Sequence, residues 1–246
     1  MGMAVSLARR SLLVLLTGAG SAQAAFWERK RFAEWSEEEV RRLLTDSPWA
    51  QVLNIPLKLE KPEPGGPATW KDVPGAGPSL PDASPGGMGG SPVGGIGAPR
   101  PKLPTSAQII VRWRSALPVR QALVRHKFGA EIDSVPARRL LELEEPFYVI
   151  EVLGIPSLVA HRGPEYLQTE LFRTAFLRTR AGRLLRAESV YVAVQGLFLG
   201  ITLRFPRKDP LRREDGWVEV GGRAEAFEFL RRFDLRRMTY AGRPAL

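Results

Sequence analysis

The chain has 246 residues, no cysteine and a formal net charge of +10 at pH 7. Without thiols it has no disulfide, no thiolate metal site and no lipid-modified cysteine, so its stability must come from a buried core. Most of the charge lies late in the chain, where 24 Lys or Arg and 16 Asp or Glu follow Pro104. A basic surface attracts anionic polymers and lipid headgroups alike, so the charge does not identify a partner.

The first 25 residues have the pattern of an export signal. A basic doublet, Arg9-Arg10, precedes an apolar run from Ser11 to Gly20 and the small-residue triplet Ala22-Gln23-Ala24. This run is shorter than the roughly 20 apolar residues of a membrane span, which favours a cleaved signal over an uncleaved anchor. We expect cleavage after Ala24 or Ala25 and a periplasmic or secreted protein. The doublet partly matches a twin-arginine signal, so the export route stays open.

A helix is predicted next, within residues 26–60. Ser36 and Glu39 have the spacing of a capping box, and Val40, Leu43 and Leu44 have the spacing of one apolar helix face. Thr45-Asp46-Ser47-Pro48 should end this helix, because Asp and Ser favour turns and the residue before proline avoids the α region. Residues 51–60 then alternate weakly, as in a strand.

Residues 61–104 contain 11 Pro and 11 Gly and few large apolar side chains. Such a segment buries too little to offset the entropy lost on ordering, so we predict a disordered linker. It has no strict Gly-x-y period, and its Gly-rich part, residues 86–97, lacks the Lys-Ser/Thr of a phosphate-binding loop. Residues 26–60 are too few to hold a core alone, so we expect them to join the sheet of the main domain, residues 105–246.

The main domain mixes helical and strand patterns. Predicted helices are 118–129, 136–144 and 164–176, and predicted strands are 109–114, 147–153, 197–205 and 217–220. Gly154-Ile155-Pro156 should close the second of these strands. Residues 224–233 fit either a helix or a strand. We therefore predict an α+β fold: a mixed, partly antiparallel sheet with helices packed mainly on one face.

Two histidines are the only candidates for a histidine base. His126 is expected on the apolar stripe of its helix near the C-terminal end, where a structural or dipole-complementing role is favoured over catalysis. His161 falls in a predicted loop, with neither a cysteine nor a nucleophile-elbow serine to accompany it. No catalytic, cofactor-binding or metal-binding residue is assigned, and no cofactor is expected.

Other side chains keep two alternatives open. Paired carboxylates, Glu142 with Glu144 or Asp215 with Glu219, could serve a glycoside hydrolase if the fold brings them together. Basic doublets near three phenylalanines could bind nucleic acid by charge and stacking, although export argues against this. The doublets are Arg138-Arg139, Arg212-Arg213, Arg231-Arg232 and Arg236-Arg237, and the aromatic residues are Phe227, Phe229 and Phe233.

Three segments resemble a group of uncharacterised exported bacterial proteins: residues 35–50, the strand around Val111-Arg112-Trp113, and residues 233–240. The resemblance spans both sides of the linker and implies one folded unit and an exported location, but no activity. Our leading hypothesis is a non-enzymatic binding or structural module of the cell envelope, whose partner is another envelope protein or an anionic envelope polymer. A secreted hydrolase and a nucleic-acid-binding protein are the alternatives.

Overall fold

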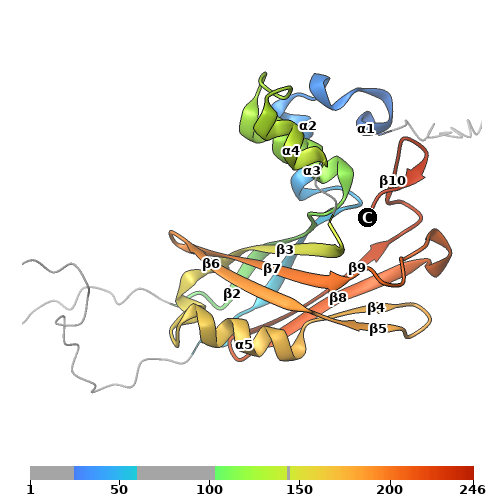
Figure 1. Ribbon diagram of the computed structural model, residues 1–246. Helices are drawn as coiled ribbons and strands as arrows, with labels where there is room; N and C mark the ends of the chain where they lie inside the picture. The colour runs from blue at the N-terminus through green and yellow to red at the C-terminus, as the bar shows by residue number, and fades with distance from the viewer. Residues whose placement is uncertain (1–24, 60–102, 143–144) are drawn as a thin grey trace, which may run out of the picture.

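The computed structural model describes residues 25–59, 103–142 and 145–246 (Figure 1). The predicted signal with Ala24, and residues 60–102 of the predicted linker, lie outside the described residues, while Ala25 directly precedes the first helix. The predicted α+β class is confirmed. The α helices are α1 (Phe26–Arg29), α2 (Glu37–Thr45), α3 (Leu117–Phe128), α4 (Val135–Glu142) and α5 (Pro164–Thr174), with short 3-10 turns η1 (Phe32–Glu34), η3 (Ser157–Ala160) and η4 (Arg213–Asp215).

The strands divide between two antiparallel sheets and a small hairpin. Sheet A has the order β1-β2-β3-β7-β6, built from β1 (Ala50–Pro56), β2 (Ser106–Trp113), β3 (Phe147–Pro156), β7 (Phe198–Pro206) and β6 (Ser189–Gln195). Sheet B has the order β5-β4-β8-β9, built from β5 (Leu184–Arg186), β4 (Phe176–Thr179), β8 (Trp217–Ala224) and β9 (Phe227–Asp234). The hairpin pairs β10 (Thr239–Tyr240) with β11 (Arg243–Pro244).

The core lies between the two sheets. Side chains alternate along each strand, so one face of each sheet turns inward and the other outward. Trp113 of sheet A is fully buried and meets Phe233 of sheet B edge to face, with ring centroids 5.7 Å apart. It meets Tyr148 of β3 in the same way at 5.5 Å. These rings join the two sheets into one core.

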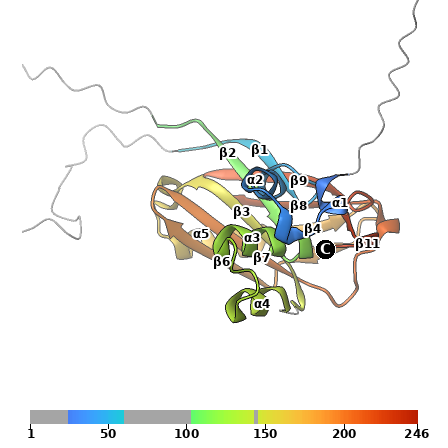
Figure 2. The ribbon, with the colours of Figure 1, turned by 90° about the horizontal axis from the view of Figure 1, so that it is seen from above.

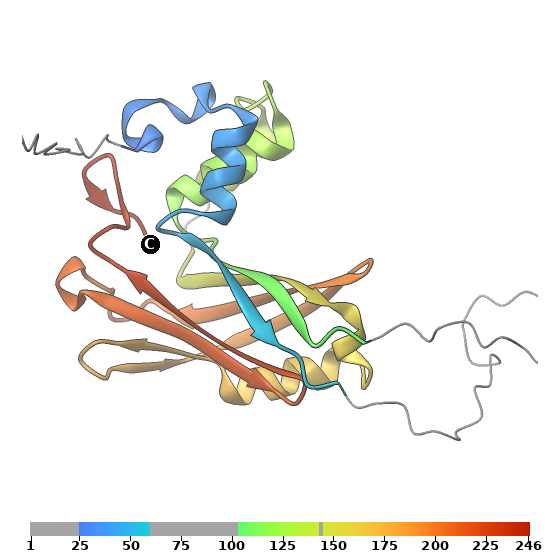
Figure 3. The same ribbon diagram turned by 180° about the vertical axis from the view of Figure 1, so that it is seen from behind.

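Contacts between β1 and β9 join the two sheets along one side of the sandwich, and the two strands run beside each other in Figure 3. Leu57 and Phe227 form an isolated β-bridge, and the Lys58 amide donates to the Ala226 carbonyl at 2.8 Å. Further along, Arg231 donates to Gln51. Since β1 also pairs with β2 along its whole length, residues 25–59 are part of the same body as the rest of the described chain.

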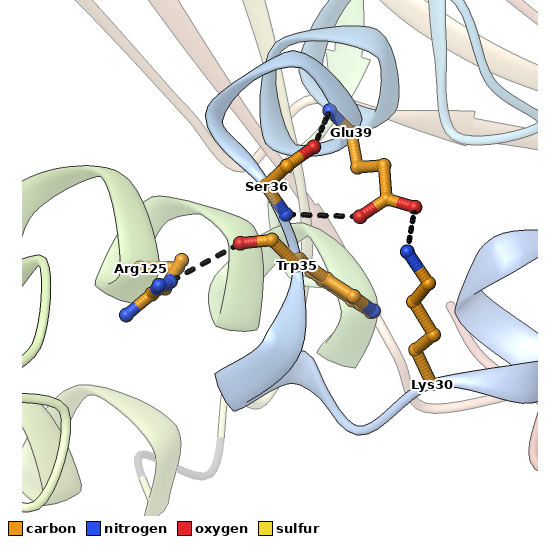
Figure 4. A network of polar contacts seen from close by, with 5 residues as sticks. All are labelled: Lys30, Trp35, Ser36, Glu39 and Arg125. Carbon is orange, nitrogen blue, oxygen red and sulfur yellow. Dashed lines mark hydrogen bonds and ion pairs between the residues drawn. The ribbon is translucent and has the colours of Figure 1, made fainter.

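Helices α2, α3 and α4 gather at one end of the sandwich, where α2 and α3 lie side by side (Figure 2). The predicted capping box is present: the Glu39 amide donates to Ser36 Oγ at 3.2 Å, and the Ser36 amide donates to Glu39 Oε2 at 2.9 Å (Figure 4). Arg125 of α3 donates to the Trp35 carbonyl at 3.3 Å, which ties the start of α2 to α3. Val40, Leu43 and Leu44 are buried, as their spacing predicts.

The two ends of the described chain meet beside these helices. The Ala241 amide donates to Glu28 Oε2 at 3.1 Å, and Trp49 Nε1 donates to the Ala245 carbonyl at 2.7 Å. Trp35 and Tyr240 also pack edge to face, with centroids 6.4 Å apart. The β10–β11 hairpin is therefore part of the packing of α1 and α2, and Figure 1 shows the C-terminus near α1.

Several sequence-based expectations differ from the structure. Gly154 does not close its strand, because β3 continues to Pro156 through a β-bulge at that glycine. Leu197 is not on a core strand but in the turn between β6 and β7, and is 79% exposed. The ambiguous residues 224–233 form the end of β8 and most of β9, because pairing with β8 turns Phe227, Phe229 and Phe233 inward. Phe176, predicted as the end of a helix, begins β4.

Candidate anion-binding site

The outward side of sheet B brings together arginines from separate parts of the chain. Strand pairing sets Arg178 of β4 opposite Glu219 of β8, and Glu219 opposite Arg232 of β9. Arg186 of β5 lies opposite Phe176 on the same side, and Arg223 follows Glu219 along β8 at a position that points outward too. We call Arg178, Arg186, Arg223 and Arg232 the arginine face.

Glu219 fixes two members of this face. It is only 7% exposed, and its Oε2 accepts from Arg178 Nη2 at 2.6 Å and from Arg178 Nε at 3.2 Å. Its Oε1 accepts from Arg232 Nη2 at 2.9 Å. The hydrogen bonds from Arg178 and then from Arg232 lower the pKa of Glu219 below its ordinary value of 4.5, against the opposing effect of burial. The carboxylate is therefore ionised at neutral pH and holds both guanidiniums in place.

This arrangement predicts a pH-dependent contribution to stability. The unfolded chain holds a proton on Glu219 more tightly than the folded chain, so the stabilisation is complete above about pH 4.5 and is lost as the pH falls through the lowered folded pKa. We expect Glu219→Gln to reduce the free energy of unfolding by about 1 kcal/mol at neutral pH, a modest value because both arginines are half exposed. Urea titrations at neutral and acidic pH measure the difference.

Glu228→Gln is the control for that substitution. Glu228 is exposed on β9 of the same sheet and makes no ion pair within the described residues, so its replacement should change stability by less than about 0.5 kcal/mol. The interpretation is wrong if Glu219→Gln is as mild as Glu228→Gln at neutral pH, or if its effect persists undiminished in acid.

Apolar side chains alternate with the arginines. One row across the strands reads Arg186, Phe176, Gly221 and Leu230, and the next reads Leu184, Arg178, Glu219 and Arg232. A Cβ on Gly221 would lie 2.7 Å from Phe176 Cζ and 3.1 Å from Leu230 Cδ1. Glycine at this position therefore lets the phenylalanine ring and Leu230 close over the sheet.

All four side chains of the arginine face are exposed to solvent. A guanidinium carries five N–H groups, and Glu219 takes only two from Arg178 and one from Arg232. Arg186 and Arg223 have no side-chain ion pair in the part of the chain that the structure describes. A depression of about 590 Å³ lies here, lined by Arg173, Phe176, Arg178, Leu184, Arg186, Arg223, Glu228 and Leu230 among others. The site can accept several anionic oxygens at once.

Aromatic rings support two of these arginines. The Arg232 guanidinium lies over the Trp217 ring at 4.1 Å from its centroid, and that of Arg178 lies 5.6 Å from the Phe176 centroid. Stacking leaves the edge of a guanidinium, where its N–H groups lie, available to an acceptor. Arg178 and Arg232 therefore each contact an aromatic ring and also donate hydrogen bonds to Glu219.

A second concavity of about 720 Å³ lies between α3, α4 and the outward face of sheet A. Two carboxylates, Glu145 and Glu151, line it, as the hydrolase alternative requires. Glu151 is already bound, however, by Arg112 at 2.5 Å and by Arg114 at 3.3 Å. Both oxygens of this carboxylate are therefore engaged by arginines, and the described residues of the cleft bring no free pair of carboxylates together as the hydrolase alternative requires.

Both histidines are exposed. His126 is exposed rather than on a buried stripe, since the residues that α3 buries are Pro118, Val119, Ala122 and Val124. Its side chain lines both the cleft above and an adjoining one beside α2. His161 is exposed in the turn that follows η3.

The carboxylate pairs proposed from the sequence have other surroundings. Glu144 lies outside the described residues, and Glu142 ends α4. Asp215 accepts from the Arg212 amide at 2.8 Å in η4, whereas Glu219 is bound by two arginines. These bonds give the second pair structural roles.

Of the basic doublets, only Arg231-Arg232 contributes a residue to the arginine face. Arg232 belongs to that face, but its neighbour Arg231 binds Gln51 where β9 meets β1. Phe227, Phe229 and Phe233 are buried in the core, so they cannot stack on bases, and that part of the nucleic-acid hypothesis is wrong. The other members of the face come from β4, β5 and β8. An alternation over 176–180, of Phe, Leu, Arg, Thr and Arg, is the signal that could have found β4.

Within the described ranges, no group of three or more His, Cys, Asp or Glu residues is placed to hold a metal ion. Nor does any helix among the described residues have the length and apolar character needed to cross a membrane.

Comparison with known proteins brings no match: no family model, no curated protein and no solved structure is significantly similar to this chain. By its geometry the chain is a two-sheet α+β protein in which one sheet face carries arginines that contact aromatic rings.

Proposed function

We propose that this protein is a non-enzymatic binding module that holds a multivalent anion on the arginine face. One observation carries the proposal: four arginines share the outward side of sheet B, two fixed by Glu219 and two without an ion pair among the described residues. Guanidinium groups bind phosphate and carboxylate oxygens through paired N–H groups. Fixing them before binding reduces the side-chain entropy that is lost when the ligand arrives.

The ligand should present several anionic groups, because the arginines are spread across four neighbouring strands. Adjacent strands lie about 4.7 to 4.9 Å apart, so the face spans on the order of 15 Å. An anionic polymer or an array of lipid headgroups of the cell envelope matches that width, and the export predicted from residues 1–25 would deliver the protein to it.

Binding to inorganic polyphosphate tests the proposal. We expect the affinity of the full chain to fall linearly on a logarithmic salt scale, since bound cations release counterions. Arg186→Gln with Arg223→Gln should lower the affinity at least about tenfold and reduce the salt slope by about 2. Neither arginine bonds Glu219, so this variant should fold like the wild type, which circular dichroism checks.

The matched control is Arg138→Gln with Arg139→Gln, which removes the same charge from exposed positions on α4. Equal loss in the two variants would show attraction by net charge alone and would refute a defined site. Absence of polyphosphate binding by the wild type at low salt would refute the function. Single-stranded DNA binding that exceeds polyphosphate binding and survives Arg186→Gln with Arg223→Gln would place a nucleic-acid site elsewhere.

A further inference from the structure

Exposed apolar side chains lie within the arginine face itself. Leu184 and Leu230 are each 47% exposed, and both line the same depression as Arg178, Arg186 and Arg223. The half-buried ring of Phe176 lies between them, directly opposite Arg186 and Gly221. This is an outward sheet face on which cationic and large apolar groups alternate at neighbouring positions.

A purely hydrophilic polyanion would bind the arginines of this surface but not its apolar side chains. It would engage the guanidiniums, but it would leave Leu184 and Leu230 in water or cover them with charged groups. A bilayer surface offers both parts at once: phosphate oxygens for the arginines, and an apolar boundary a few ångströms deeper for the leucines. Arginines also extend to headgroups while their apolar stems lie along the hydrocarbon edge.

We infer that the multivalent anion is the surface of an anionic phospholipid bilayer, which sheet B contacts with its outward face. The inference rests on the proposed function and specifies its ligand. Charge complementarity supports this occupant, because the face carries four arginines against an ion-paired Glu219 and the exposed Glu228, and the whole chain has a net charge of +10. The contact is peripheral, since a sheet face lies on the headgroups and does not span the bilayer.

A second apolar cluster serves as an internal comparison. Val194, Leu197 and Phe198 are exposed at and beside the β6–β7 turn, and Leu158 is exposed in η3, whose Ser157 amide donates to the Leu197 carbonyl at 2.9 Å. No arginine or lysine occurs among residues 189–198. Val194, Leu197 and Phe198 are more exposed than Leu184 or Leu230, but their own strand and turn segment carries no cationic side chain. Leu197 therefore distinguishes apolar contact in general from contact by the combined surface.

The test measures co-sedimentation of the full chain with vesicles of phosphatidylcholine, with and without phosphatidylglycerol, beside binding to polyphosphate. We expect binding to the mixed vesicles and little to phosphatidylcholine alone. Leu184→Thr with Leu230→Thr should weaken vesicle binding roughly tenfold and leave polyphosphate binding within about twofold. Arg186→Gln with Arg223→Gln should weaken both, and Leu197→Thr should weaken neither.

The outcomes separate the two proposals. Polyphosphate binding without vesicle binding, or vesicle binding that the two leucine substitutions do not change, would overturn the lipid inference and leave the anion site standing. Vesicle binding that Leu197→Thr abolishes would also overturn it, because the β6–β7 turn would then be the contact. If the wild type does not bind polyphosphate at low salt, the proposed function fails, and the lipid inference that rests on it fails too.

Discussion

Replacing Trp113 by alanine should reduce the free energy of unfolding by about 3 to 5 kcal/mol, which is the usual cost of removing a large buried aromatic side chain. Trp113 is fully buried, and its ring touches Tyr148 of sheet A and Phe233 of sheet B. Alanine would leave a cavity where the two sheets meet, and no neighbouring side chain from one sheet can fill it without moving away from the other. Urea unfolding followed by circular dichroism measures the loss.

Phenylalanine at the same position should restore most of the stability. Among the described residues, Trp113 Nε1 has no hydrogen-bond partner, so phenylalanine keeps much of the ring and removes a buried donor. Trp49→Phe is the contrasting substitution, because Trp49 Nε1 donates to the Ala245 carbonyl at 2.7 Å and that bond would be lost. If Trp113→Phe is as damaging as Trp113→Ala, the shape of the indole, rather than cavity formation, decides the cost.

Gly154→Ala should destabilise the protein by about 2 to 4 kcal/mol, although it adds a single methyl group. The residue has φ +89°, a region that costs an L-residue about 1 to 2 kcal/mol. Its Cβ would also lie 2.8 Å from the Gln108 carbonyl oxygen, a backbone atom of the paired strand β2 that cannot rotate away. Overpacking of this kind adds about 1 to 3 kcal/mol. Thermal or urea unfolding checks the total.

Gly182→Ala separates the two contributions. Gly182 has nearly the same φ, +86°, but no atom lies within 4 Å of its Cβ position. It should therefore show only the conformational part, about 1 to 2 kcal/mol. Equal effects at the two glycines would mean that the bulge in β3 relaxes to admit the methyl group.

Local patterns predicted much of the fold. Ser36 and Glu39 form the predicted capping box, and the alternation of Ile109, Val111 and Trp113 places all three in the core. These signals are local, since each depends on residues within one turn or one strand. The division of the strands into two sheets is not local, because it depends on which strand edges meet across more than a hundred residues.

The candidate site was not predicted for a related reason. Arg178, Glu219 and Arg232 are separated by 41 and 13 residues, and only the register of β4, β8 and β9 sets them in one row. Strand β4 has four residues and follows α5 after one residue, so its pattern merges with that of the helix. The net charge does not indicate which face carries the arginines, because that depends on the pairing of the strands.

The meeting of the chain ends has a consequence for the order of folding during synthesis. Contacts join Glu28 to Ala241 and Trp49 to Ala245, 213 and 196 residues apart. A ribosome adding about 5 to 20 residues per second needs on the order of 10 to 40 seconds to make the intervening chain. Helices α1 and α2 therefore lack these neighbours until residues 241–245 have been made. The packing at this end of the molecule is therefore the last to be completed, and it depends on the β10–β11 hairpin.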